Sequence, residues 1–191
     1  SELAGWCRTQ QLPLLISTST NATTGSEARA RQWRYDELHQ VCQQINQNDG
    51  GNSCCSVVTG HTASDRAETL LLQLSRGTDL AGLASLRWER SLKGNASDGI
   101  RLVRPLLNFS RDETAAICSD LQLPIWTDPS NSDSRFARNR IRQEVLPVLE
   151  TMYPGCSRRM AELSERVSQV QDTQSALLAL SLEHLKGQNG A

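Results

Sequence analysis

The protein has 191 residues, with 20 Lys and Arg against 21 Asp and Glu and a formal net charge of −1. This length suits one domain with an appendage, and a composition of 38% hydrophobic and 21% charged residues is that of a chain that folds. The near-neutral charge excludes a globally basic nucleic-acid binder but is compatible with a local basic patch. No apolar run approaches the roughly 20 residues that span a bilayer, so we expect a cytoplasmic protein without a membrane partner.

The six cysteines give no sign of a metal or disulfide framework. They are scattered without any Cys-x-x-Cys pair, which argues against a structural zinc site, an iron–sulfur cluster and a disulfide scaffold. We expect small buried hydrophobic side chains at these positions, which are Cys7, Cys42, Cys54, Cys55, Cys118 and Cys156.

The first half of the chain alternates strands and helices. Residues 12–17 form a short continuous apolar run, typical of a strand buried in a parallel sheet, and residues 54–59 form a second β-prone run. Apolar residues at helical intervals predict a helix over 26–45 and another from Ser64 to Gly77. This order predicts an α/β fold with a partial Rossmann-like parallel sheet, in which residues 14–17 and 56–59 are parallel strands.

The second half reads as largely helical. Residues 100–107 look extended, and the capping box Ser110-x-x-Glu113 predicts a helix to about Leu121. A further helix is expected over 135–152, with Pro147 as a kink or break, followed by a long amphipathic helix after Gly155. We therefore expect three parts, an α/β domain over 1–109, a helical continuation over 110–154 and a long helix over 155–191.

The densest group of polar residues lies where the second strand passes into its helix. Gly60 and His61 follow the strand, and Asp65 and Glu68 lie three apart on one face of what we expect to be an exposed first helical turn. Ligands of parallel α/β sheets bind beyond the carboxyl ends of the strands, so the two acids could hold a hydrated Mg²⁺ ion or position a reacting group. The alternative is that both acids complement the helix dipole and His61 satisfies a cap.

A second group is basic. Arg138 and Arg142 lie four apart on one helical face, an arrangement suited to phosphate. The alternative is a solvated face whose arginines pair with Asp133 or Glu144. The arginines in this run are Arg135, Arg138, Arg140 and Arg142. A shorter basic turn ahead of Tyr35 contains Arg29, Arg31 and Arg34. By itself, this shorter turn is typical of an ordinary exposed helical face.

Five short motifs occur in an order that resembles the tRNA(Ile)-lysidine synthetase family of the PP-loop (N-type ATP pyrophosphatase) group. The resemblance extends from about Glu27 to Pro154. The motifs are Glu27-x-x-Ala30-Arg31-x-x-Arg34-Tyr35, Gly60-His61-x-x-x-Asp65-x-x-Glu68-Thr69, Arg76-Gly77-Thr78-x-Leu80-x-Gly82-Leu83, Arg104-Pro105-Leu106-Leu107, and Asp128-Pro129-Ser130-Asn131 followed by Arg138-Asn139-Arg140-Ile141-Arg142.

This resemblance implies an ATP-dependent ligase. Such an enzyme adenylates the wobble cytidine of tRNA(Ile) with a CAU anticodon, and the ε-amine of free L-lysine then displaces AMP to form lysidine. ATP and Mg²⁺ are the implied co-substrate and ion, and the long C-terminal helix leaves a homodimer open. The implied residues are Asp65, Glu68 and Arg142 for catalysis, Gly60 and His61 for ATP, Asp65 for Mg²⁺, and Arg31, Arg34, Arg138, Asn139 and Arg140 for substrate and tRNA.

The chain departs from the family pattern in two places. Thr62 stands where the family has a second histidine, and Ser64 where it has a first aspartate. The Ser-Gly-Gly-x-Asp-Ser loop that grips pyrophosphate in this group is not found in the sequence, so we expect an N-terminally truncated form that is inactive alone. Two alternatives stay open, a relative of the PP-loop tRNA thiolases and a non-catalytic tRNA-binding module.

Overall fold

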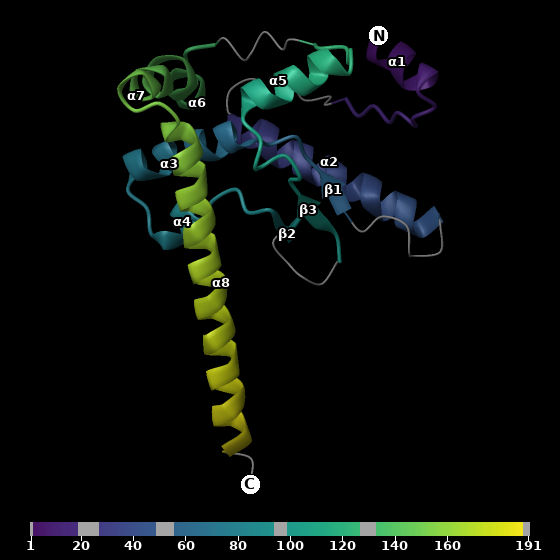
Figure 1. Ribbon diagram of the computed structural model, residues 1–191. Coiled ribbons are helices and arrows are strands. Elements are labelled where there is room, and N and C mark those ends of the chain that lie inside the picture. The colour runs from purple at the N-terminus through teal and green to yellow at the C-terminus, as the bar shows by residue number, and fades with distance from the viewer. Residues whose placement is uncertain (1, 19–26, 49–55, 94–98, 127–132, 189–191) are drawn as a thin grey trace. The chain divides into compact units, whose positions relative to one another are not determined.

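The computed structural model describes residues 2–18, 27–48, 56–93, 99–126 and 133–188, and it divides into two compact units, residues 1–54 and 55–191. The first unit holds helices α1 (Glu2–Thr9) and α2 (Glu27–Asn48), and α2 confirms the helix predicted over 26–45 (Figure 1). The strand predicted over 12–17 is wrong. Residues 12–18 form neither helix nor strand, and Leu15 and Ile16 are 69% and 72% exposed. A strand needs a hydrogen-bonded neighbour, and the described part of this unit offers none.

The second unit contains a three-stranded sheet in the order β1-β3-β2. β1 (Ser56–Val58) pairs in parallel with β3 (Arg101–Val103), and β2 (Glu89–Ser91) pairs antiparallel with β3. The predicted α/β class is confirmed, although the parallel neighbour of β1 is residues 101–103 and not residues 14–17. Val57 and Leu102 face each other in register and are buried, which explains the apolar character of both segments.

Helix α3 (Ala63–Arg76) follows β1 and begins with a reciprocal cap. The Asp65 backbone N–H donates to the Thr62 hydroxyl, and the Thr62 backbone N–H donates to the Asp65 carboxylate. The helix ends before Gly77, whose φ of 71° places it in the left-handed region that favours glycine. The helix predicted from Ser64 to Gly77 is thus confirmed, with Thr62 as its cap. A short helix, α4 (Leu80–Leu83), follows.

Helix α5 (Arg111–Asp120) confirms the capping box of Ser110 and Glu113. The helix predicted over 135–152 is present as α6 (Ala137–Arg140), a π-helical turn η3 (Ile141–Val145) and α7 (Leu146–Met152). Pro147 lies in the first turn of α7 and has no N–H to donate, so the wider π turn accommodates it without a break. The Asp128-Pro129-Ser130-Asn131 motif lies outside the described residues.

The long predicted helix is confirmed as α8 (Cys156–Gln188), which packs against α3 and α4 in its first half (Figure 1). Ala161, Ser164 and Ser168 are buried along this contact, whereas the side chains from 172 to 185 are exposed. A core of Ala67, Ile141 and Leu146 joins α3 to the η3–α7 segment; partly buried Leu71, Leu72 and Met160 pack against it. None of the helices in the described ranges has the length and hydrophobicity of a transmembrane span.

Three of the four cysteines that the structure describes are small buried side chains, as expected. Cys7, Cys42 and Cys156 are buried, Cys118 is partly buried, and all four are free thiols. Cys54 and Cys55 lie outside the described residues. The domain boundaries expected at 109 and 154, and the pairing of α8 with a second copy, stay predictions.

Candidate functional site

The site predicted from the sequence lies at the carboxyl end of β1. His61 follows this strand by three residues, and its Nδ1 atom is 2.9 Å from the Thr59 hydroxyl oxygen. A Cβ placed at Gly60 would meet no atom of the described residues within 4 Å, so among them the backbone here is open to a ligand. Because β3 runs parallel to β1, the carboxyl ends of both strands share this edge, as expected for a ligand site in a parallel sheet.

The two acids of α3 are not on an exposed turn, and this expectation was wrong. Glu68 is fully buried, and the Asp65 side chain is only 15% exposed. The cause is long-range packing, because arginines from α5, α6 and η3 close over the first two turns of α3. Sequence spacing placed both acids correctly on one helical face but could not show what covers that face.

Glu68 is the centre of this arginine cluster. Arg142 forms a two-pronged pair with it, with Nε 2.6 Å from one carboxylate oxygen and a terminal nitrogen 2.9 Å from the other. Arg138 donates from Nε at 2.8 Å, and Arg111 donates from a terminal nitrogen at 3.3 Å. A buried carboxylate is stable only when paired in this manner.

Asp65 extends the same network toward the surface. One of its oxygens accepts from the backbone N–H and the hydroxyl of Thr62, each at 2.8 Å. The other accepts from Arg138 at 3.0 Å and from Arg111 at 3.4 Å, and Arg142 lies 3.8 Å away. The cluster of Asp65, Glu68, Arg111, Arg138 and Arg142 therefore joins three guanidinium groups to two carboxylates and carries a net charge of +1.

These contacts shift the pKa values of Asp65 and Arg142. Burial alone would raise the pKa of Asp65, but the Thr62 hydrogen bonds and the charges of Arg138 and Arg111 outweigh it, so this pKa lies below its ordinary value. The hydrogen bond to Glu68 and the nearby carboxylate charges raise the pKa of Arg142, against the effect of burial. Asp65 and Arg142 are both charged at neutral pH.

Asp65 does not offer a magnesium site in this arrangement. Its oxygens already accept hydrogen bonds from Thr62 and two arginines, and a guanidinium beside a carboxylate repels a divalent cation. Within the described ranges there is also no group of three His, Cys, Asp or Glu side chains that could hold a metal ion. The residues present therefore do not fit Mg²⁺ here.

The other residues of the basic run contact groups outside this cluster. Arg140 pairs with Glu144, and Arg135 pairs with Asp133, which are the two solvated pairs anticipated as an alternative for the basic run. Asn139 is buried, and its side-chain amide donates to the Asp133 carbonyl at 2.9 Å. In the other unit, Arg31 and Arg34 are exposed on α2, and the Arg31 guanidinium lies 5.2 Å from the centre of the Tyr35 ring.

Arg111 is the cluster residue that the sequence did not identify. It occupies the first position of α5, where the helix dipole disfavours a positive charge. This unfavourable placement is the signal that could have found it. Its backbone N–H also donates to the Ser64 hydroxyl at 3.1 Å, which ties α5 to α3.

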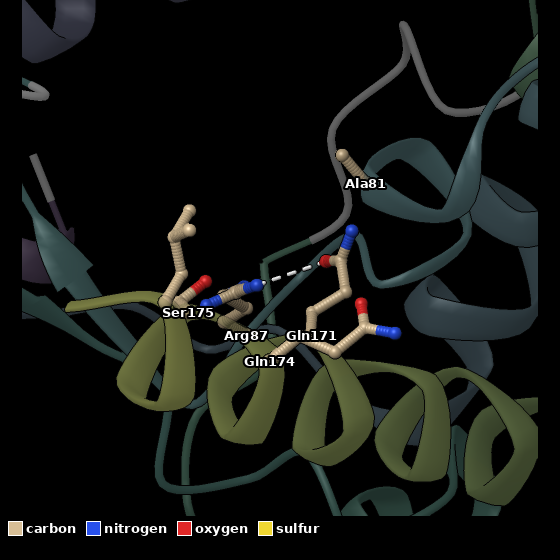
Figure 2. Close-up of a pocket in the computed structure, with 6 residues that line it drawn as sticks. Ala81, Arg87, Gln171, Gln174 and Ser175 are labelled. Carbon is tan, nitrogen blue, oxygen red and sulfur yellow. Dashed lines mark hydrogen bonds between the residues drawn. The ribbon is translucent and has the colours of Figure 1, made fainter. Parts of the chain in front are cut away.

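A cavity of about 390 Å³ lies between α4 and α8 and shares no lining residue with the cluster. Figure 2 shows the Arg87 guanidinium beside the Gln171 side chain, to which it donates a hydrogen bond of 3.0 Å. Arg87 also pairs with Asp172, so its charge is balanced within the protein. The cavity is lined by Ala81, Arg87, Gln171, Gln174, Ser175 and Leu178.

Comparison with known proteins identifies the family to which this chain belongs. Residues 2–149 match the family model described as a PP-loop domain, so this chain belongs to the PP-loop family. The chain also resembles a solved U34-tRNA thiolase from Methanococcus maripaludis, with a TM-score of 0.62 over 87% of this chain and 55% of that one. At 15% sequence identity this similarity shows a shared fold.

Curated relatives give the closer resemblance. The tRNA(Ile)-lysidine synthase of Parasynechococcus marenigrum is 55% identical over 190 residues, which cover 100% of this chain and 54% of that protein. A tRNA(Ile)-lysidine synthase of Prochlorococcus marinus is 41% identical over 189 residues, covering 99% of this chain and 55% of that protein. The chain thus spans about half the length of the curated relatives it matches, and the family resemblance of its motifs is confirmed.

Proposed function

We propose that this chain belongs to an ATP-dependent ligase of the cytoplasm that joins free L-lysine to the wobble cytidine of tRNA(Ile) with a CAU anticodon. The observation that carries the proposal is 55% identity to a tRNA(Ile)-lysidine synthase along the whole of this chain. The reaction has two steps. ATP adenylates the cytidine with release of pyrophosphate, and the lysine ε-amine then displaces AMP.

The arginine cluster supports this chemistry by its position and its charge. Transfer of an adenylyl group develops negative charge on phosphate, and fixed guanidinium groups stabilise such charge without reorganising. In this proposal Glu68 and Asp65 are positioning residues that hold Arg138 and Arg142 in one geometry at the strand edge. Gly60 and His61 would lie beside the nucleotide, where the backbone is open.

The exposed arginines would serve tRNA binding. Arg31, Arg34 and Arg140 are all on the surface of their helices, where guanidinium groups can contact RNA phosphates without reading sequence. The buried amide of Asn139 would hold the start of α6 and thereby orient its neighbours. Magnesium, the usual companion of ATP, would in this proposal arrive with the nucleotide.

The test replaces the matching region of the Parasynechococcus marenigrum enzyme with this chain. The chimera is incubated with ATP, radiolabelled lysine and a tRNA(Ile) transcript that carries a CAU anticodon. We expect ATP-dependent transfer of lysine to the RNA, and none to a transcript whose wobble base is changed. A folded chimera that binds the transcript but transfers no lysine, beside an active parent enzyme, would reject the ligase and favour a non-catalytic tRNA-binding module.

A further inference from the structure

Arg111 differs from the other two arginines of the cluster in how firmly it is held. Arg138 and Arg142 each donate to a carboxylate at 2.6–3.0 Å and are 18% and 23% exposed. The contacts of Arg111 are 3.3 and 3.4 Å long, and its side chain is 42% exposed. Arg111 therefore lies at the exposed edge of the cluster and makes the longest contacts with the two acids.

The balance of charges in the cluster leaves the extra positive charge on Arg111. Two guanidinium groups are enough to neutralise Asp65 and Glu68, and the short contacts of Arg138 and Arg142 already do so. Of the five N–H groups on the Arg111 guanidinium, two donate to these acids, and within the described ranges the other three have no hydrogen-bond partner. A half-exposed guanidinium with spare donors and an unbalanced charge is suited to a ligand with anionic oxygens.

The backbone of Arg111 is fixed although its head group is loosely held. Its N–H donates to Ser64 at 3.1 Å, and its carbonyl accepts from the Thr114 hydroxyl at 2.8 Å. The preceding residue closes the capping box with Glu113. The side chain thus starts from a rigid point, and only its guanidinium has to turn to meet a ligand.

From this geometry we propose that Arg111 is a phosphate-contacting residue of the site. This inference rests on the proposed function and deepens it, because it identifies which arginine touches the phosphate. Arg111 gives up its long contacts and pairs with two phosphate oxygens, while Arg138 and Arg142 keep the carboxylates neutral. The phosphate belongs either to the nucleotide or to the RNA backbone, and both present the same oxygens.

The test measures phosphate binding by the full chain, with AMP, inorganic pyrophosphate and a tRNA(Ile) transcript as separate probes in titration calorimetry and filter binding. Arg111→Ala is expected to weaken binding of at least one probe tenfold or more. Arg111→Lys should recover only part of this loss, because an ammonium cannot form the forked pair. The control is Arg101→Ala, which removes the same charge from an exposed position on β3 paired with Glu89, and it should stay within twofold of the unmodified chain.

The probes also separate the two sources of phosphate. A nucleotide contact predicts weaker AMP or pyrophosphate binding in Arg111→Ala with an unchanged salt slope for tRNA, whereas an RNA contact predicts a salt slope lower by about 0.7. The proposal is overturned if the unmodified chain binds none of the probes at millimolar concentration, or if Arg111→Ala binds all three within twofold. Since these titrations need no lysine transfer, Arg111-dependent binding beside a chimera that transfers no lysine would reject the ligase and leave the phosphate contact standing.

Discussion

The strongest prediction concerns stability, and it follows from the burial of Glu68. Glu68→Gln removes the charge that three arginines share and raises the net charge of the cluster from +1 to +2. Removing one partner of a buried ion pair typically costs about 3–5 kcal/mol, because the other charge stays buried without compensation. Arg138 and Arg142 retain some exposure, and Asp65 still faces both, so we expect the lower end of this range, about 3 kcal/mol.

Urea unfolding at neutral pH, followed by circular dichroism, measures this loss. The matched control is Glu144→Gln, which removes the same charge from an exposed pair with Arg140 one helical turn away. The control should unfold at the same urea concentration as the unmodified protein within error. If Glu68→Gln lowered the free energy of unfolding by less than about 1 kcal/mol, the buried network would not be the stabilising feature that its geometry indicates.

Three further predictions concern single contacts. Glu150 caps α8 through its carboxylate, which lowers the pKa of Glu150 from 4.5 to about 2; Glu150→Gln should therefore cost about 1 kcal/mol near neutral pH, and the difference should vanish as pH falls through 4.5 toward 2 in thermal unfolding. Ser164→Ala removes a buried hydroxyl that donates to the Leu83 carbonyl at 2.7 Å, so urea unfolding should show a loss of about 1 kcal/mol, and no loss would mean that water replaces the hydroxyl. Thr62→Ala removes the hydroxyl that donates to Asp65, so a carboxyl titration by NMR should give a higher pKa for Asp65, and an unchanged value would assign its depression to the Thr62 backbone N–H and the arginines.

Local patterns predicted the helices well because the relevant interactions are local. The capping box of Ser110 and Glu113 and the apolar spacing that begins at Ala67 are both complete within a few residues. The apolar run over 12–17 failed for the opposite reason. Whether such a run becomes a strand depends on a partner elsewhere in the chain, and no local pattern reports that partner.

The same distinction applies to the candidate site. Spacing placed Asp65 and Glu68 on one helical face and Arg138 and Arg142 on another, and both placements hold. That these faces meet could not be predicted, because Arg138 and Arg142 lie 70 and 74 residues from Glu68 along the chain. The basic run contains no acid of its own, and the charges that balance Arg138 and Arg142 come from α3.

Helix α8 is packed differently before and after the residue at which Arg87 contacts it, Gln171. This helix has 33 residues and is about 50 Å long, but its buried side chains all come before this contact, and those from 172 to 185 are exposed. Opening the supported part requires breaking the packing of the whole unit, whereas opening the rest costs only the helix–coil equilibrium of a short segment, which is marginal in water. The two parts of one continuous helix thus differ in local stability. Protection of the backbone amides from hydrogen exchange should therefore fall from full protection to rapid exchange within a turn or two of Gln171.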